Sequence, residues 1–119
     1  MKVCITSQGP ELSSPVDPRF GRAQTFIIYD SETGAFEALD NRQNLQAAQG
    51  AGIQAAQNVV RSGAEVVLTG HCGPKAFAVL SRAGVEIFTG AAGSVQEAVE
   101  AWKSGSLSKA AGADVEGHW

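Results

Sequence analysis

The segments VLTGHCGP (residues 67–74) and IFTGAAGS (residues 87–94) carry one pattern twice: an apolar run, then Thr-Gly-x-x-Gly, then a helix start. Each copy ends in a residue that favours the first turn of a helix, proline at the first helical position or serine as N-cap. Two consecutive strand-loop-helix units predict an α/β protein whose sheet is largely parallel. The repeat also predicts that the two glycine loops share one backbone conformation.

The two copies differ in the pair between the glycines, which is His71-Cys72 in the first and Ala91-Ala92 in the second. Two alanines are sufficient for the second loop, so the first loop is a candidate site. Imidazole and thiol are both metal ligands, and Cys72 and His71 are therefore the candidate metal ligands. The alternatives are a small Cys72 side chain packed beneath the loop and a His71 ring that donates a hydrogen bond to a carbonyl.

Composition describes one ordinary domain. The chain has 119 residues, of which 44% are hydrophobic and 18% charged, and a net charge of −3. We expect no nucleic-acid partner because there is no overall basic field, and no membrane span because no apolar run approaches the roughly 18 residues that a span needs. The absence of a signal-peptide pattern predicts a cytoplasmic protein. Cys4 lies within an apolar strand and is expected to be a packing residue. We expect a monomer or weak dimer.

Periodicity and turn residues predict one domain over residues 1–103, with a flexible tail over 104–119. The domain contains five expected strands and three expected helices. The strands are 2–6, 25–30, 35–39, 65–69 and 85–89, and the helices are 49–62, 74–83 and 94–103. The turn at 31–34 makes the second strand antiparallel to its neighbours. The last helix starts with a capping box, Ser94-x-x-Glu97.

Chain direction then brings the functional segments together. Segments 7–24 and 40–48, both glycine loops and the N-termini of all three helices fall at one edge of the predicted sheet. Open α/β sheets bind ligands at such an edge. Helix N-termini and loop amides attract anions, so we expect an anion-binding edge.

The long segment 7–24 ends in DPRFGR (residues 17–22), which places two guanidinium groups and an aromatic ring around a glycine. Arg42 and Lys75 are expected at the same edge, although the arginines could instead pair with nearby aspartates. Arginine suits oxyanions and polarisable anions. The candidate cofactor-binding residues are Arg19, Phe20, Gly21, Arg22, Asn41, Gly70, His71, Cys72 and Gly73.

Several of these stretches match a family. DPRFGRA (17–23), FIIYD (26–30), Gly70-x-x-Gly73-x-x-Ala76 and GVEI (84–87) resemble the dinitrogenase iron-molybdenum cofactor biosynthesis family, the NifX-like domains also found at the C-terminus of NifB. The resemblance covers residues 1–103. It implies a ribonuclease H-like α/β fold, with a mixed five-stranded sheet that has one antiparallel strand and is flanked by three helices.

The resemblance also implies a role in binding or carrying a metal-sulfide cluster. Among stand-alone members, the chain looks most like a small carrier of a molybdenum-copper sulfide cluster. The expected cofactor is that cluster or a related iron-molybdenum or iron-sulfur cluster, and the expected partners are cluster donor or acceptor proteins. Such a cluster is a bulky anion, which arginines and backbone amides can hold without a covalent ligand.

Other functions fit the residues less well. A structural zinc site usually takes four Cys or His ligands, and the chain has four such residues in total without metal-site spacing. The strand 2–6 contains no carboxylate for two-metal nuclease chemistry, and adjacent residues such as His71 and Cys72 usually point apart, so we expect no enzymatic activity. A protein-interaction module and a phosphate- or nucleotide-binding domain remain as alternatives.

Overall fold

The structure is a computed structural model that describes residues 1–42 and 51–110. It contains a mixed sheet, three α-helices and one short 3-10 helix. The strands are β1 (Lys2–Ser7), β2 (Thr25–Asp30), β3 (Phe36–Asp40), β4 (Val66–Leu68), β5 (Glu86–Thr89) and β6 (Ser108–Lys109). The helices are η1 (Phe20–Arg22), α1 (Ala51–Arg61), α2 (Pro74–Arg82) and α3 (Val95–Lys103).

The sheet has six strands in the order β3-β2-β1-β4-β5-β6, and β1, β4 and β5 are parallel. The predicted count of five strands with one antiparallel strand is therefore wrong. β2 is antiparallel to β1 and β3, and β6 is antiparallel to β5. A strand of two residues is too short to show an alternating pattern, so β6 could not be predicted from the sequence. The likeness to ribonuclease H stays a prediction.

β6 lies within 104–119, the segment predicted to be a flexible tail. Phe88 pairs with Lys109 and Thr89 with Ser108, and the Ala110 N–H donates to the Ile87 carbonyl at 2.8 Å. The sheet thus extends past the expected end of the domain at residue 103. The rest of the expected tail, residues 111–119, lies outside the described residues.

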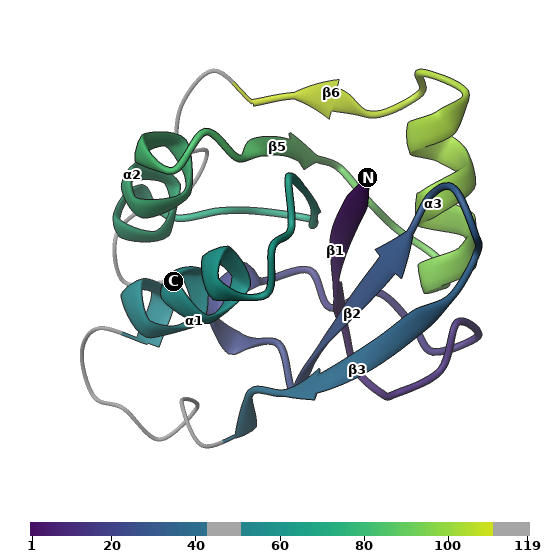
Figure 1. The fold of residues 1–119 in the computed structure, drawn as a ribbon, viewed down its shortest axis with the longest axis horizontal. Coiled ribbons are helices and arrows are strands. Elements are labelled where there is room, and N and C mark those ends of the chain that lie inside the picture. The colour runs from purple at the N-terminus through teal and green to yellow at the C-terminus, as the bar shows by residue number, and fades with distance from the viewer. Residues whose placement is uncertain (43–50, 111–119) are drawn as a thin grey trace.

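Helices cover both faces of the sheet, with α1 and α2 on one face and α3 on the other (Figure 1). Alternate residues of β1 enter the two cores: Cys4 belongs to the α1 and α2 side, and Val3 and Ile5 belong to the α3 side. Burial raises the pKa of the Cys4 thiol, which fits the packing role expected for it. The long segment 8–24 and the loops after β4 and β5 all leave the same edge of the sheet, as predicted from chain direction.

The helix α3 starts as the sequence predicts. The Glu97 N–H donates to Ser94 Oγ at 3.1 Å, and the Ser94 N–H donates to Glu97 Oε1 at 3.0 Å. The two bonds form the capping box and satisfy two donors that a helix start would otherwise leave unpaired.

In the described parts of the chain, no helix has the length and apolar character needed to cross a lipid bilayer.

Segment 8–24 is fixed to both glycine loops through its backbone. The His71 N–H donates to the Pro18 carbonyl at 2.7 Å, and the Val16 N–H donates to the Gly93 carbonyl at 2.8 Å. The first of these contacts requires glycine at position 70, because a Cβ there would lie 2.7 Å from the Pro18 carbonyl oxygen and 2.8 Å from its Cα. Backbone atoms at such a distance must move for any larger side chain to fit.

Gly70→Ala is expected to lower the free energy of unfolding by about 1 to 3 kcal/mol, because the added methyl group overpacks the contact with Pro18. The matched control is Gly52→Ala. A Cβ at position 52 meets the Ala76 Cβ at an ordinary 3.6 Å, and alanine favours helix α1. Urea denaturation of both variants checks the prediction, and equal stabilities would show that the loops do not depend on this contact.

Candidate functional site

Arg19 and His71 lie side by side on two short extended segments. Their backbones form an isolated parallel bridge, in which the His71 N–H donates to the Pro18 carbonyl and the Phe20 N–H donates to the His71 carbonyl at 3.2 Å. Both residues are exposed. We call residues 17–22 and 70–75 together the loop edge. It brings a guanidinium group and an imidazole from distant parts of the sequence to one surface.

A short turn sets the position of Arg19. Its backbone N–H donates to Asp17 Oδ1 at 3.0 Å, and the Thr6 hydroxyl donates to the Asp17 carbonyl at 2.7 Å. Burial raises the pKa of the Asp17 carboxyl, and the hydrogen bond and charge of Arg19 oppose that rise. Among the described residues, none forms a hydrogen bond or ion pair with the Arg19 guanidinium. Its donors are therefore available to a ligand.

Three of the predicted site residues are buried. Phe20 is 1% exposed, and its ring centroid lies 5.3 Å from that of Phe26, so it packs in the core. Gly21 is buried within η1. Asn41 is also buried, and its amide Nδ2 donates to the Ala23 carbonyl at 2.8 Å, which ties the end of β3 to the start of β2. These three residues lie beneath the surface of the loop edge.

Cys72 is also in the core. It is 1% exposed and belongs to the apolar cluster beneath α1 and α2, and its Sγ lies 3.7 Å from the Gly73 carbonyl oxygen. The neighbouring His71 is exposed, because adjacent residues of an extended segment point to opposite sides. In the described part of the chain, no three His, Cys, Asp or Glu side chains are grouped as metal ligands.

The two glycine loops do not share one backbone conformation, and that prediction is wrong. Gly90 and Gly93 have φ angles of +84° and +78°, whereas neither glycine of the first loop has a positive φ. The buried member of the pair also differs: it is Cys72 in the first loop and Ala91 in the second. The reason is topological, since the first loop leads to α2 on one face of the sheet and the second to α3 on the other.

The helix N-termini also differ. Gly73 caps α2 without a side-chain hydrogen bond, Pro74 has no N–H, and the N–H groups of Lys75 and Ala76 have no acceptor among the described residues. This helix start can donate to an anion. At α3, segment 8–24 occupies the corresponding donors, because the N–H groups of residues 95 and 96 donate to the carbonyls of Ser14 and Leu12. Residues preceding α1 lie outside the described residues.

The remaining predicted groups differ in how accessible they are. Gly73 and Arg22 are half-buried, and Lys75 is exposed at the start of α2. Arg42 is exposed but pairs with Asp40, with 3.0 Å between Nη2 and Oδ2. The hydrogen bonds from Arg42 lower the pKa of the Asp40 carboxyl. Much of the positive charge of Arg42 is therefore compensated by Asp40. Of the four cations expected at this edge, Arg19 and Lys75 best fit a role toward a ligand.

A pair of buried threonines was not identified from the sequence. The Thr6 and Thr69 hydroxyls lie 3.0 Å apart at the ends of β1 and β4, and Thr69 Oγ1 lies 3.4 Å from the His71 carbonyl oxygen. The pair joins the two strand ends from which the loop edge starts. The signal was the threonine before each glycine loop, but the pattern alone could not separate Thr69 from the half-buried Thr89.

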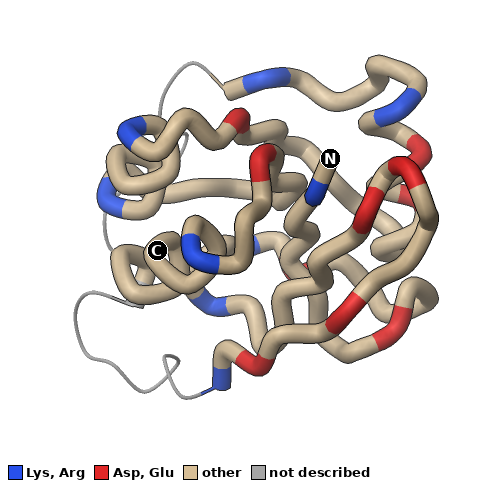
Figure 2. Tube along the Cα trace, in the orientation of Figure 1, with Lys and Arg blue, Asp and Glu red and all other residues tan. Residues whose placement is uncertain are grey.

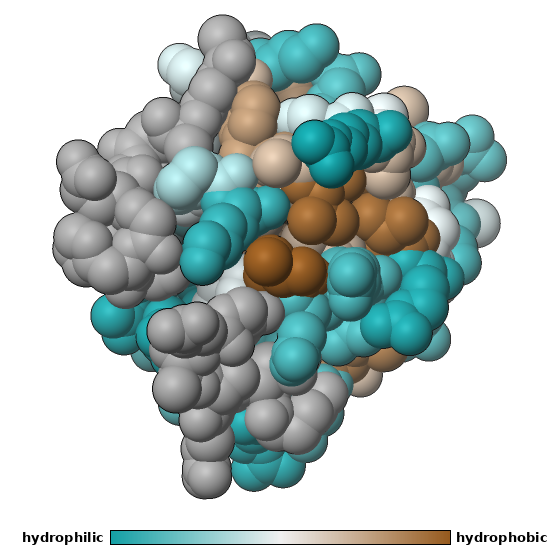
Figure 3. Space-filling model, turned by 90° about the vertical axis from the view of Figure 1, so that its left-hand side faces the viewer, coloured by the Kyte–Doolittle hydropathy of each residue, from teal (hydrophilic) through white to brown (hydrophobic). Residues whose placement is uncertain are grey.

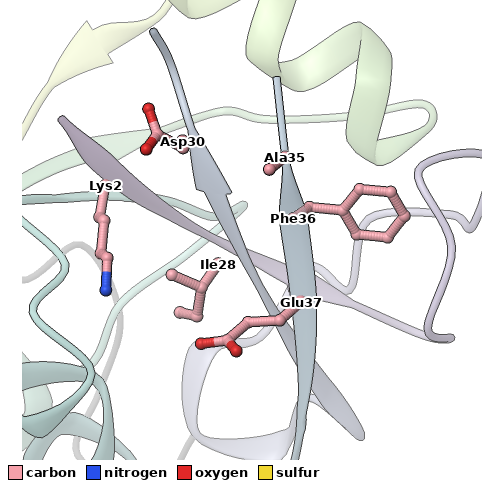
Figure 4. A pocket seen from close by; sticks show the side chains of 6 residues that line it. All are labelled: Lys2, Ile28, Asp30, Ala35, Phe36 and Glu37. Atoms are coloured by element: carbon pink, nitrogen blue, oxygen red, sulfur yellow. The ribbon is translucent and has the colours of Figure 1, made fainter. Parts of the chain in front are cut away.

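Other parts of the surface differ from the loop edge in charge and shape. Figure 2 shows basic positions without acidic ones along α1 and α2, and acidic positions without basic ones along β2 and β3. A separate hollow of about 250 Å³ lies at the opposite end of the sheet, where Lys2 and Glu37 extend beside Ile28 and the Phe36 ring points away (Figure 4). Its mixed charges offer no comparable anion site.

Comparison with known proteins agrees with this geometry. The structure is similar to that of the apo form of the orange protein from Desulfovibrio gigas, with 42% identity, a TM-score of 0.93 and 96% of each chain covered. It is also similar to a putative NifB protein from Thermotoga, with 40% identity, a TM-score of 0.80 and 91% of each chain covered.

An uncharacterized protein of Methanocaldococcus jannaschii is 25% identical over 111 residues, which are 92% of this chain and 91% of that protein. The model of the family described as "Dinitrogenase iron-molybdenum cofactor" matches residues 1–105. That match spans all strands and helices except β6. The chain therefore belongs to the dinitrogenase iron-molybdenum cofactor family.

Proposed function

We propose that this protein binds and carries an anionic metal-sulfide cluster at the loop edge. The observation that carries the proposal is the pairing of Arg19 with His71 beside the uncapped start of α2. Membership of a family named after the iron-molybdenum cofactor supports cluster or cofactor binding in general. The similarity to the orange protein and to a putative NifB protein supports the same general role.

Each exposed group has a distinct task in this proposal. The Arg19 guanidinium donates from a planar fork to sulfide or oxide atoms, and the N–H group of the exposed Lys75 donates from the positive end of α2. The Lys75 ammonium adds a charge at the same helix start. Together these groups hold an anion by hydrogen bonds and charge, as the resemblance to cluster carriers leads us to expect.

The cluster we propose is a molybdenum-copper sulfide, with an iron-molybdenum or iron-sulfur cluster as the related alternative. The exposed His71 imidazole is a good ligand for copper. Cys72 is the softer ligand, but its burial means that direct ligation would require the loop at 70–73 to move. We therefore assign His71 as the more accessible candidate ligand and Cys72 as a packing residue beneath the site.

The proposed role is that of a non-enzymatic carrier, in the cytoplasm, that exchanges its cluster with donor or acceptor proteins. The ends of β1 and β4 carry Thr6 and Thr69 where two-metal chemistry would need carboxylates. The strand order β3-β2-β1-β4-β5 supports the ribonuclease H-like relationship implied by the family resemblance. A carrier needs a site that binds and releases, and an edge built from charge and amides meets that need.

Titration of the protein with tetrathiomolybdate and copper, and separately with iron and sulfide, is expected to produce charge-transfer absorption that saturates at a single cluster per chain. Inorganic phosphate serves as the competing anion. A spectrum equal to that of the free reagents would contradict the carrier proposal. Displacement of the cluster by low phosphate concentrations would instead favour a phosphate-binding domain.

Arg19→Gln is expected to weaken cluster binding by about tenfold, because charge-assisted hydrogen bonds contribute strongly to anion binding. Arg42→Gln is the matched control, since it removes the same charge near the same sheet edge from a side chain already paired with Asp40. Its effect on affinity should stay below about twofold. Equal losses in the two variants would mean that only net charge matters at this edge.

Cys72→Ala is expected to lower the free energy of unfolding by about 1 kcal/mol through lost packing and to leave the absorption of the bound cluster unchanged. His71→Ala should alter the absorption of a copper-containing cluster, because the exposed imidazole is the candidate copper ligand. Thermal denaturation and absorption spectra of both variants separate the roles. A changed spectrum in the Cys72 variant alone would reverse the assignment.

A further inference from the structure

A groove separates α1 and α2 on the outer face of the molecule. It has a volume of about 540 Å³ and is lined by Gln57, Val60, Arg61, Val79, Arg82 and Ala83. Figure 3 looks onto this side of the molecule and shows apolar surface bordered by hydrophilic side chains. Val60 and Val79 are only partly buried, although both pack against the core cluster. The groove thus has an apolar floor with an arginine on each helix.

Charge on the two helices has one sign. α1 and α2 contain Arg61, Lys75 and Arg82 and no acidic residue, although the chain as a whole has a net charge of −3. The Arg61 guanidinium donates to Asn58 Oδ1 at 2.6 Å, and neither Arg61 nor Arg82 forms an ion pair with a described residue. Two uncompensated cations therefore stand beside apolar surface on this face.

The helix dipole accounts for part of this arrangement. Arg61 and Arg82 lie in the last turns of their helices, where a cation is favourable. Lys103 occupies the same place in α3, but that helix also contains two glutamates, and the Lys103 ammonium lies 5.4 Å from the Tyr29 ring centroid. The dipole explains a cation at each helix end. It does not explain two acid-free helices that enclose an open apolar groove.

From this complementarity we infer that the α1–α2 groove is a docking surface for an acidic amphipathic helix of a partner protein. Apolar side chains spaced by three and four residues on such a helix would cover Val60, Val79 and Ala83, and flanking carboxylates would reach Arg61 and Arg82. The β2–β3 hairpin carries four acidic residues and no basic one, so it repels an acidic helix. Of the hairpin and the α1–α2 groove, only the groove attracts such a helix.

The inference does not rest on the proposed cluster function. The groove lies at the C-terminal ends of α1 and α2, whereas the loop edge lies at the N-terminal end of α2. A helix of nine residues is about 13 Å long, so a partner in the groove leaves the loop edge uncovered. A bound partner and a bound anion can therefore be present together.

The test uses the full chain and two synthetic helical peptides, one with a leucine stripe flanked by glutamates and one in which lysines replace the glutamates. Backbone amide NMR shifts are followed during titration. We expect the acidic peptide to shift residues 57–61 and 79–83 and the basic peptide to leave them unchanged. R61Q combined with R82Q should weaken acidic-peptide binding by about fivefold or more.

K103Q combined with K109Q is the matched control, because it removes two positive charges from the α3 and β6 side of the molecule. Its effect on affinity should stay below about twofold. Equal effects of the two double variants, shifts outside the groove, or no binding of the acidic peptide at millimolar concentration would overturn the inference. If the unmodified chain binds the acidic peptide but takes up no cluster, the proposed function is contradicted and the docking inference is not.

Two other occupants are distinguished by the same titration. If groove shifts grow with protein concentration in the absence of peptide, a second copy of the chain fills the groove. If D114N combined with E116Q in the full chain tightens peptide binding, the chain's own C-terminal segment competes for the groove. Either result would overturn the assignment to a partner protein.

Discussion

The contact between Gly70 and the backbone of Pro18 is the constraint on which the loop edge depends. It lets segment 8–24 pair with the loop after β4, so that Arg19 and His71, which are far apart in the sequence, become neighbours. The buried Thr6 and Thr69 hydroxyls hold the strand ends from which both segments leave. The exposed groups that could contact a ligand are therefore supported by buried backbone contacts. These buried contacts, more than the exposed groups, determine the relative positions of Arg19 and His71.

Local patterns predicted most of the fold because they have local causes. The capping box of α3 is an interaction between residues three apart, and the buried strands β1, β2 and β4 follow from short apolar runs that can be read in a single stretch. The strand β6 and the different conformations of the two glycine loops could not be predicted in this way. Both depend on which face of the sheet the chain must reach next, and that is a property of the assembled sheet.

The candidate site shows the same division. The sequence predicted that the loops meet at one edge of the sheet, because chain direction alone brings them together. It did not separate the residues that reach the surface from those beneath it: Phe20, Asn41 and Cys72 proved to be buried, while Arg19 and His71 are exposed. Residue chemistry indicates what a side chain can bind, whereas its direction depends on backbone pairing across the two segments. For Cys72 the difference is a single position along one extended segment.

The burial of both thiols has a consequence for the carrier function proposed above. Cys4 and Cys72 lie in one apolar cluster, where neither is open to stray copper or to oxidants. An exposed thiolate would capture soft metal ions almost irreversibly. Contacts made through charge and backbone amides can instead be broken by competing ions, so a cluster held in the proposed way could leave intact when a recipient offers a stronger set of ligands.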